Sequence, residues 1–531
     1  MGNDDQWKKR VEELQAKNMI DENQEETLKK MISSPDKENT YLAKEIMASK
    51  MATKLVDGLN EGQAEAFAEI LDFFGDPKEE AFVLKGYAGT GKTFLVKRIL
   101  EHITARFPNR RIAITAPTNK AVRVLQASAP FSSEATAGLV FKDLFNAEAK
   151  ISYQTIHKLL GLREQITASG QQLFKADGRN KSEITEFKYL IVDEVSMLDD
   201  ELCEEILKYN EDVKILFMGD PAQIPPINRA DSIPFRENHN HVFRRAELTE
   251  IMRQKGDHPV VDASFLIRNN LDSIHPIPTL ETKLNADEHG IIFFDAEADR
   301  AKVRPMLNEY FNSDAFKMDA NYAKVIAWRN KTVNYMNGII RELLYGADAP
   351  RFVVGEKLIA ASPIFEKSKD RWGFKWIVQY NTSEEMEVIS VKEMMHKFNE
   401  GSFNLNAKVW QLRVKAYDPV MKEDYFGLVN VMHEDSVKEW KDELASAKQT
   451  AINLRQKEAW VRYYNMMKWS ADVAYNYAIT CHKAQGSTYN NVLLVEEDME
   501  LNRKVVERNR IKYTAYTRPS DKLFILRKNY V

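Results

Sequence analysis

The octapeptide GYAGTGKT occupies residues 86–93 of this 531-residue chain and matches the phosphate-binding pattern G-x-x-x-x-G-K-[ST]. Residues 81–85, AFVLK, read as a short buried strand, and residues 94–101, FLVKRILE, read as a helix. Glycines allow the backbone to turn with positive φ, so that its N–H groups approach phosphate oxygens at the start of the helix. Strand, loop and helix together predict a nucleoside triphosphate site.

The last two residues of the loop and one upstream glutamine are candidates for contact with this nucleotide. We expect Lys92 to reach the β- and γ-phosphates and the Thr93 hydroxyl to ligate Mg²⁺. Upstream, Gln63 lies in the first turn of a helix capped by Asn60. A glutamine amide both donates and accepts, as reading an adenine edge requires, although a surface glutamine is the usual case.

Composition and length place the chain among soluble globular proteins. Hydrophobic residues make up 44% and charged residues 29% of it, and a prior of about 150 residues per domain predicts three or four domains. The N-terminus is polar and no apolar run approaches the roughly 18 residues of a membrane span, so we expect a cytoplasmic protein with no membrane partner. The two cysteines lie far apart, which argues against a disulfide framework or a zinc site.

The net charge of −4 removes the simple argument that a globally basic protein binds nucleic acid. Binding to a strand would have to come from a local groove between domains. Overall charge therefore neither supports nor excludes such a partner.

Two buried strands end in polar residues. Residues 187–192, FKYLIV, precede Asp193 and Glu194. We expect Asp193 to hold Mg²⁺ through water and Glu194 to orient and deprotonate the attacking water. Residues 213–218, VKILFM, precede Gln223, which is placed to sense the γ-phosphate. This order after a phosphate loop indicates nucleotide hydrolysis.

Two arginines are candidates for contact with the γ-phosphate. Arg253 lies in the segment ELTEIMRQ at residues 247–254, and Arg518 follows KYTAYT near the C-terminus. Arg518 is the natural arginine finger, offered by a second domain to a phosphate on the first. A solvent-facing arginine is the competing explanation for each.

Other polar clusters suit a nucleic-acid strand. A strand at residues 111–117 precedes Thr118 and Asn119, and hydroxyls at a helix N-terminus suit a backbone phosphate, although ordinary capping explains them equally well. Residues 480–488, TCHKAQGST, follow another strand at the edge where α/β sheets bind ligands. Residues 162–188 read as an inserted hairpin in which Phe174 presents an aromatic tip that opens a duplex, or else packs inward.

The second half of the chain repeats the α/β pattern with an interruption. Alternation resumes at residues 323–331, AKVIAWRNK, and predicts a second parallel-sheet domain. Residues 352–470 read as a small β-barrel-like insert followed by helices over 436–468. The core sheet is predicted to return with residues 473–479, and residues 1–54 read as a helical arm.

In chain order the motifs GYAGTGKT, APTNKA, TIHKLLG, VDEVSM, GDPAQIPP, ELTEIMRQ, AITCHKAQGST and YTAYTRP resemble superfamily 1 helicases of the 5′-to-3′ branch, most closely the phage Dda-type DNA helicases. The resemblance implies an α/β fold with two RecA-like P-loop domains, a β-hairpin pin in the first, and an SH3-like β-barrel tower in the second. The implied division is a helical N-terminal arm at 1–54, domain 1A at 55–255 with the pin at 162–188, domain 2A at 256–351 and 471–531, and the tower at 352–470.

The resemblance also implies residue roles. The ATP site would comprise the adenine-reading Gln63, the phosphate loop, the two carboxylates and the γ-phosphate contacts: Gln63, Gly89, Thr90, Gly91, Lys92, Thr93, Asp193, Glu194, Gln223, Arg253 and Arg518. Single-stranded DNA would be gripped by Thr118, Asn119, Thr155, His157, Thr480, His482 and Lys483. Pro519 and Phe94 depart from the family pattern without removing a catalytic group.

The implied function is ATP- and Mg²⁺-dependent 5′-to-3′ translocation on single-stranded DNA and unwinding of forked duplex. Such a motor of a phage type would act as a monomer on DNA, with replication or recombination proteins as partners. A translocase that strips proteins or remodels RNA is a second hypothesis. A nucleotide-gated binding protein is a third, against which intact Glu194 and Arg518 argue.

Overall fold

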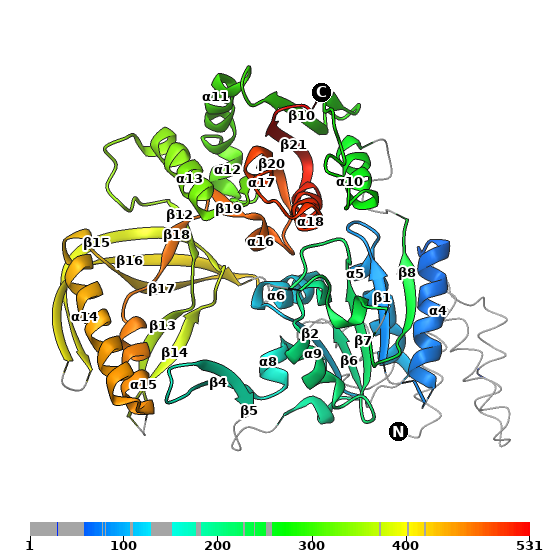
Figure 1. Cartoon of the computed structure of the whole chain (residues 1–531), viewed down its shortest axis with the longest axis horizontal. Helices are drawn as coiled ribbons and strands as arrows, with labels where there is room; N and C mark the ends of the chain where they lie inside the picture. Colours follow the sequence, from blue (N-terminus) through cyan, green and yellow to red (C-terminus); the bar gives the residue numbers. More distant parts are fainter. Residues whose placement is uncertain are drawn as a thin grey trace.

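The computed structural model describes Lys29 and residues 58–530, apart from 77, 80, 107–109, 129–150, 177–181, 227–228, 238, 251–257, 371–372, 401–402 and 419–420. The helical arm predicted over residues 1–54, Lys29 excepted, and the candidate Arg253 lie outside the described residues. Two α/β units and a β-rich insert make up the described part (Figure 1). None of its helices combines the length and the apolar character that crossing a membrane would need.

The first α/β unit is built on an all-parallel sheet with strand order β3-β2-β6-β7-β1-β8. Its strands are β1 (Ala81–Gly86), β2 (Ile112–Ala116), β3 (Ile151–Thr155), β6 (Tyr189–Val192), β7 (Lys214–Gly219) and β8 (Arg244–Leu248). Alternate side chains face opposite ways, so Phe82 and Leu84 pack with one set of helices and Val83 with another. Helices cover both faces, which explains why the strands read as continuous apolar runs.

The helices on the Phe82 side are α4 (Glu61–Gly75), α5 (Lys92–Arg106) and α6 (Asn119–Ser128), and those on the Val83 side are α8 (Ile156–Leu159) and α9 (Asp200–Leu207). Helix α4 starts with a capping box, in which the Asn60 side chain accepts from Gln63 N at 2.7 Å and the Gln63 side chain accepts from Asn60 N at 3.1 Å. The predicted cap at Asn60 is therefore confirmed.

The second unit is also a mainly parallel sheet, with strand order β19-β11-β20-β21-β10-β9 and an antiparallel edge strand β9. Its strands are β9 (Lys283–Leu284), β10 (Gly290–Asp295), β11 (Ala323–Ala327), β19 (Ala478–Thr480), β20 (Tyr489–Val495) and β21 (Pro519–Arg527). Helices α10 (Pro259–Asn269), α16 (Cys481–Ala484) and α18 (Val505–Tyr516) pack with one face, and α11 (Arg300–Phe311) and α13 (Asn330–Tyr345) with the other. Two short helices, α12 (Asp314–Met318) and α17 (Glu496–Met499), complete the unit. The chain therefore has the predicted α/β class with two parallel-sheet cores.

The insert between β11 and β19 is rich in antiparallel strands, as the sequence predicts. A five-stranded sheet, β17-β16-β15-β12-β18, is formed by β12 (Lys357–Ala360), β15 (Glu385–Glu400), β16 (Phe403–Asp418), β17 (Glu423–Met432) and β18 (Val473–Tyr475). A separate hairpin joins β13 (Ile364–Asp370) to β14 (Gly373–Tyr380). Helices α14 (Glu434–Leu454) and α15 (Lys457–Met467) follow, close to the predicted helical region.

The predicted return of the core sheet at Val473 is wrong by five residues. Strand β18 pairs with β12 of the insert, and only β19, starting at Ala478, joins β11 of the second sheet. The buried Asn337 explains the break, because its Oδ1 accepts from Tyr477 N at 3.1 Å and Ala478 N at 2.8 Å while its Nδ2 donates to Ala478 O at 3.0 Å. These bonds occupy backbone groups where the chain changes sheets.

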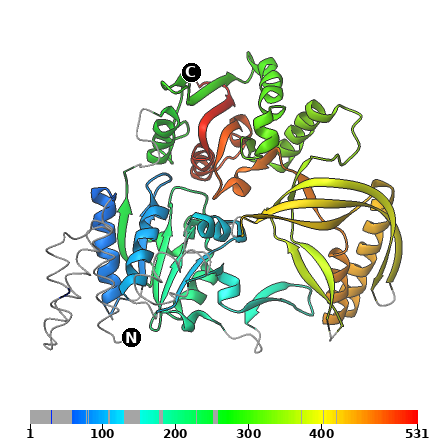
Figure 2. The same ribbon diagram turned by 180° about the vertical axis from the view of Figure 1, so that it is seen from behind.

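The hairpin of β4 (Leu162–Ile166) and β5 (Gln172–Ala176) extends from the first unit to the insert, where its tip meets α15 (Figures 1 and 2). The expectation that Phe174 forms the tip is wrong. Phe174 lies within β5 opposite Glu164, and the turn is made by residues 167–171, where Gly170 has φ +83°. The Phe174 side chain is 56% exposed and packs edge-on against His157, with ring centroids 4.7 Å apart.

Replacing Asn337 with leucine is expected to destabilise the second unit by about 2–3 kcal/mol, because buried backbone groups of Tyr477 and Ala478 would lose their partners. Chemical denaturation followed by circular dichroism measures the change. The exposed Asn334→Ala on the same helix is the matched control. Equal unfolding midpoints for both variants would contradict the assigned role of Asn337.

Candidate functional site

The loop between β1 and α5 forms a compact cradle. Gly89 and Gly91 have φ angles of +81° and +79°, a region that glycine enters without steric cost. Lys92 Nζ donates to the carbonyl oxygens of Gly86 and Tyr87, the latter at 3.1 Å. Thr90 Oγ1 also donates to Tyr87 O at 2.8 Å. The predicted phosphate loop therefore has its expected strand–loop–helix setting, with the lysine held against the loop.

The two predicted carboxylates lie beside this loop at the end of β6. Asp193 N donates to Thr115 O of the neighbouring strand β2 at 2.9 Å, so the pairing of the two strands continues to Asp193. Glu194 has a left-handed backbone, with φ +53° and ψ +38°, a conformation that costs a non-glycine residue about 1 kcal/mol or more. Asp193, Glu194 and Lys92 line one cavity of about 390 Å³. The structure thus brings the loop and the carboxylates together.

Burial dominates the electrostatics of this pair. Burial, reinforced by the neighbouring Asp193 carboxylate, raises the pKa of Glu194 to about 7, against the lowering influence of Lys92 and Arg518. Burial also raises the pKa of Asp193. A group with the raised pKa of Glu194 accepts a proton near neutral pH, which is a property of general bases.

The second unit contributes the opposite wall of the same cavity. Arg518 and the segment 486–488 line it, facing Lys92 and Gln223 of the first unit. The Arg518 guanidinium is 6% exposed and is held by Thr514 O at 2.8 Å and Ser487 O at 3.1 Å. Lys92 and Arg518 therefore meet at one site from two different sheets.

A polar network joins the two units directly beneath the cavity. Asp220 Oδ2 accepts from Ala88 N of the loop at 2.9 Å and from the Tyr513 hydroxyl of α18 at 2.7 Å. Gln485 Nε2 donates to Gln223 Oε1 at 3.2 Å. The sequence alone assigns no role to Asp220, Tyr513 or Gln485. The only available signal was that each lies inside one of the quoted motifs.

The Gln63 side chain, which the sequence predicts to contact an adenine, is bonded to protein groups in the structure. Its side chain is 1% exposed and lies behind the loop, where Nε2 donates to Thr90 O at 2.9 Å and Oε1 accepts from Asn60 N. In this arrangement Gln63 connects the capping box of α4 to the phosphate loop. Contact with an adenine stays a prediction.

The seven predicted strand-gripping residues lie in and just beyond the carboxyl ends of strands in both sheets. They are Thr118, Asn119, Thr155 and His157 after β2 and β3, and Thr480, His482 and Lys483 after β19. Thr155 and Thr480 each cap a short helix, accepting from Lys158 N and Lys483 N, both at 3.4 Å. Both threonines therefore act as helix caps. The seven residues together place polar groups along the carboxyl edge of each sheet.

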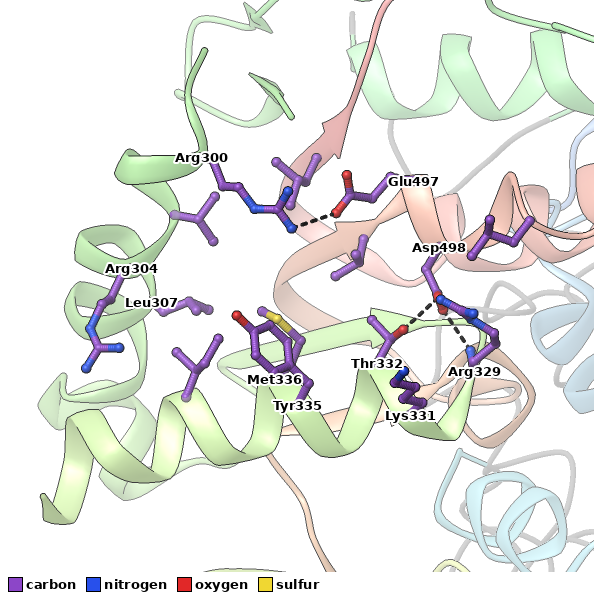
Figure 3. A pocket seen from close by; sticks show the side chains of 15 residues that line it. Arg300, Arg304, Leu307, Arg329, Lys331, Thr332, Tyr335, Met336, Glu497 and Asp498 are labelled. Atoms are coloured by element: carbon purple, nitrogen blue, oxygen red, sulfur yellow. Dashed lines mark hydrogen bonds and ion pairs between the residues drawn. The ribbon is translucent and has the colours of Figure 1, made fainter. Parts of the chain in front are cut away.

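A larger cavity of about 520 Å³ lies in the second unit, away from the phosphate loop (Figure 3). At its edge, Asp498 accepts from Arg329 N at 2.8 Å, Arg329 Nε at 2.7 Å and Thr332 Oγ1 at 2.6 Å. Asp498 therefore caps α13, whose own residue Arg329 makes no side-chain cap bond. These polar groups stabilise the start of α13.

Two family models and several known proteins match this chain. Residues 58–283 match the model of an AAA domain, and residues 475–526 match that of a UvrD-like helicase C-terminal domain. The chain is 26% identical to the uncharacterized protein R530 of Acanthamoeba polyphaga mimivirus, over 86% of this chain and 97% of that protein. It is also 26% identical to the ATP-dependent DNA helicase dda of Enterobacteria phage T4, over 82% of this chain and 92% of that protein.

Among solved structures, a Pif1 helicase studied at forked double-stranded DNA aligns with 89% of this chain and 92% of its own, at 14% identity and a TM-score of 0.43. Two parallel sheets that share a phosphate-loop cavity define a two-domain P-loop nucleotide-binding protein. Within that class, the matched regions are similar to those of superfamily 1 helicases of the 5′-to-3′ branch.

Replacing Gly86 with alanine is expected to weaken nucleotide binding about 10- to 100-fold, the equivalent of one charge-assisted hydrogen bond. A Cβ at this position would lie 2.7 Å from Lys92 Cγ and would displace the lysine from the cradle. Titration with a fluorescent ATP analogue measures the affinity. Gly62→Ala, whose Cβ would meet no atom closer than 3.9 Å, is the control, and equal affinities would count against the cradle.

Proposed function

We propose that this chain is an ATP-dependent DNA helicase that moves 5′-to-3′ along single-stranded DNA and separates forked duplex. The observation that carries the proposal is the shared cavity, in which Lys92 of the first sheet faces Arg518 of the second. A site completed by two domains can couple a chemical step to their relative motion.

In this proposal each side chain at the cavity has a distinct role. The loop N–H groups and Lys92 hold the β- and γ-phosphates, and Glu194 orients and deprotonates the attacking water. Gln223 and Arg518 contact the γ-phosphate, and Arg253 is proposed as a further contact. The buried position of Arg518 supports this role, because its guanidinium is already fixed by backbone carbonyls before any charge develops.

The residues present fit a magnesium ion. The Thr93 hydroxyl and the Asp193 carboxylate both line the cavity and offer the oxygen ligands that Mg²⁺ prefers. The low-dielectric surroundings that raise the pKa of Asp193 also strengthen its attraction for a cation. When bound, Mg²⁺ supplies charge neutralisation at the phosphate oxygens.

Motion would follow from contacts that exist only in the closed state. ATP would draw the sheets together through the contact between Arg518 and the γ-phosphate, and loss of that phosphate would release them. The strand would then be held alternately by two polar edges, one containing Thr118 and His157 and the other containing Thr480 and Lys483. We further propose that the protein acts as a monomer in the cytoplasm, with replication or recombination proteins as partners.

The direct test is unwinding of duplexes that carry one single-stranded tail. We expect ATP-dependent separation of DNA with a 5′ tail and little separation with a 3′ tail. Matched RNA duplexes test the class of nucleic acid. Preference for the 3′ tail would contradict the polarity, and RNA unwinding without DNA unwinding would contradict the substrate.

Replacing Arg518 with alanine is expected to lower the rate of DNA-stimulated ATP hydrolysis by about 10³- to 10⁵-fold while DNA affinity stays within about two-fold, because an arginine finger acts on the transition state. Steady-state phosphate release and DNA anisotropy titration measure the two effects. The exposed Arg503→Ala in the same unit is the control. Retained turnover in R518A would remove the assigned role.

Replacing Glu194 with glutamine is expected to stop hydrolysis while ATP still binds. The amide keeps the shape of the carboxylate but cannot accept the proton of the attacking water. Phosphate release and binding of a fluorescent ATP analogue separate the two effects, with the exposed Glu237→Gln as control. A variant that no longer binds ATP would show that Glu194 holds the nucleotide instead.

A further inference from the structure

A cavity of about 690 Å³ in the insert is lined by aromatic rings. Phe365 and Trp376 come from the β13–β14 hairpin, Phe398 from β15, and Trp469 follows α15. Phe398 and Trp469 are buried and stack with their centroids 5.1 Å apart at an interplanar angle of 12°. Phe365 and Trp376 are only half-buried, so part of each ring is accessible from the cavity.

Lysines surround these rings. Lys367, Lys397 and Lys468 line the cavity beside the carboxylate of Glu366, so these four side chains carry a formal charge of +2, from three lysines and one glutamate. Lys468 Nζ lies 4.9 Å from the centroid of the Phe365 ring, and Lys367 Nζ lies 5.7 Å from that of Trp376. Aromatic faces next to ammonium groups are the two components of sequence-independent binding to single strands, in which bases stack and phosphates pair with cations.

The cavity and the docking place of the β4–β5 hairpin lie along the same helix, α15. Along α15 and its C-cap, Trp460, Tyr464 and Lys468 follow at intervals of four residues and so lie along one side of the helix. The Tyr464 hydroxyl donates to Gly170 O at 2.8 Å, and a Cβ on Gly170 would lie 2.5 Å from the Trp460 ring. With a rise of about 1.5 Å per residue, the hairpin tip and the lysine at the cavity are about 6–12 Å apart along this side.

We propose that this cavity binds the DNA strand that is excluded when a duplex is separated at the β4–β5 hairpin. Bases of that strand stack on Phe365 and Trp376, and its phosphates pair with Lys397 and Lys468. The inference rests on the proposed helicase function and adds a second nucleic-acid site to it, separate from the polar edges of the two sheets. Holding the excluded strand prevents it from pairing again behind the fork.

The test uses the full chain and forked DNA with a single 4-thiothymidine in either the excluded strand or the tracking strand. Ultraviolet crosslinking followed by peptide mapping locates each strand on the protein. The test variant is Lys397→Glu/Lys468→Glu. A milder variant, Lys397→Gln/Lys468→Gln, replaces it in the comparison if the Glu variant fails to fold. Lys448→Glu, an exposed lysine of α14 that does not line the cavity, is the matched control.

In the wild type and in K448E, we expect the excluded strand to crosslink to peptides that line the cavity. In K397E/K468E this crosslink is expected to fall about 10-fold, the order of one lost stacking or phosphate contact, while the tracking-strand crosslink is retained. Losing two phosphate contacts should also reduce the slope of log affinity against log salt concentration for the fork by about 1.4.

Equal crosslinking of the excluded strand in wild type and K397E/K468E, or crosslinks that map away from the cavity, would overturn the proposal. An acidic peptide as the true occupant would give that same result. A wild-type chain that shows no ATP-driven unwinding would overturn the proposed function instead, so the two failures are distinguishable. If the Glu variant loses DNA-stimulated ATP hydrolysis, the Gln variant is compared with the wild type instead. The same crosslinking outcomes then support or overturn the proposal.

Discussion

Asp220 accepts hydrogen bonds from both α/β units at once, and the geometry of the ATP site depends on this carboxylate. Its Oδ2 accepts from Ala88 N and the Tyr513 hydroxyl, and its Oδ1 accepts from Ala222 N at 2.9 Å. A carboxylate that is 1% exposed cannot leave these donors without a large desolvation cost. Asp220 therefore bonds the phosphate loop to helix α18, which leads to Arg518.

Two further contacts extend this coupling to the insert. Arg123 and Lys120 on α6 pair with Glu384 at 2.8 Å and Glu385 at 3.4 Å, and the β4–β5 hairpin meets α15. Burial raises the pKa of Glu385, but Lys324 and Lys120 more than offset this, so its pKa lies below the ordinary value. The first unit is thus bonded to the second unit at the nucleotide cavity and to the insert at two other places. A change in the angle between the sheets must alter all three contacts.

The sequence predicts those features of the structure that depend on residues close together in the chain. The phosphate loop, the strand before Asp193 and Glu194, and the cap at Asn60 depend on residues within a few positions of one another, and all have the predicted structure. The tip was misplaced at Phe174 because the hairpin turns at residues 167–171, which pairs Phe174 with Glu164. The return of the core sheet was misplaced because the sheet that a strand joins depends on distant partners, here Asn337. Tyr513 and Gln485 went unassigned for the same reason.

The most direct measurement of the central claim is a crystal structure of the chain with single-stranded DNA, Mg²⁺, ADP and aluminium fluoride as a mimic of the transferring phosphate. We expect Lys92 Nζ and a guanidinium nitrogen of Arg518 both to lie within about 3.2 Å of the fluoride ligands. We also expect the Asp220–Tyr513 hydrogen bond to persist. Clear density for the nucleotide with Arg518 directed away from the aluminium fluoride would contradict the claim.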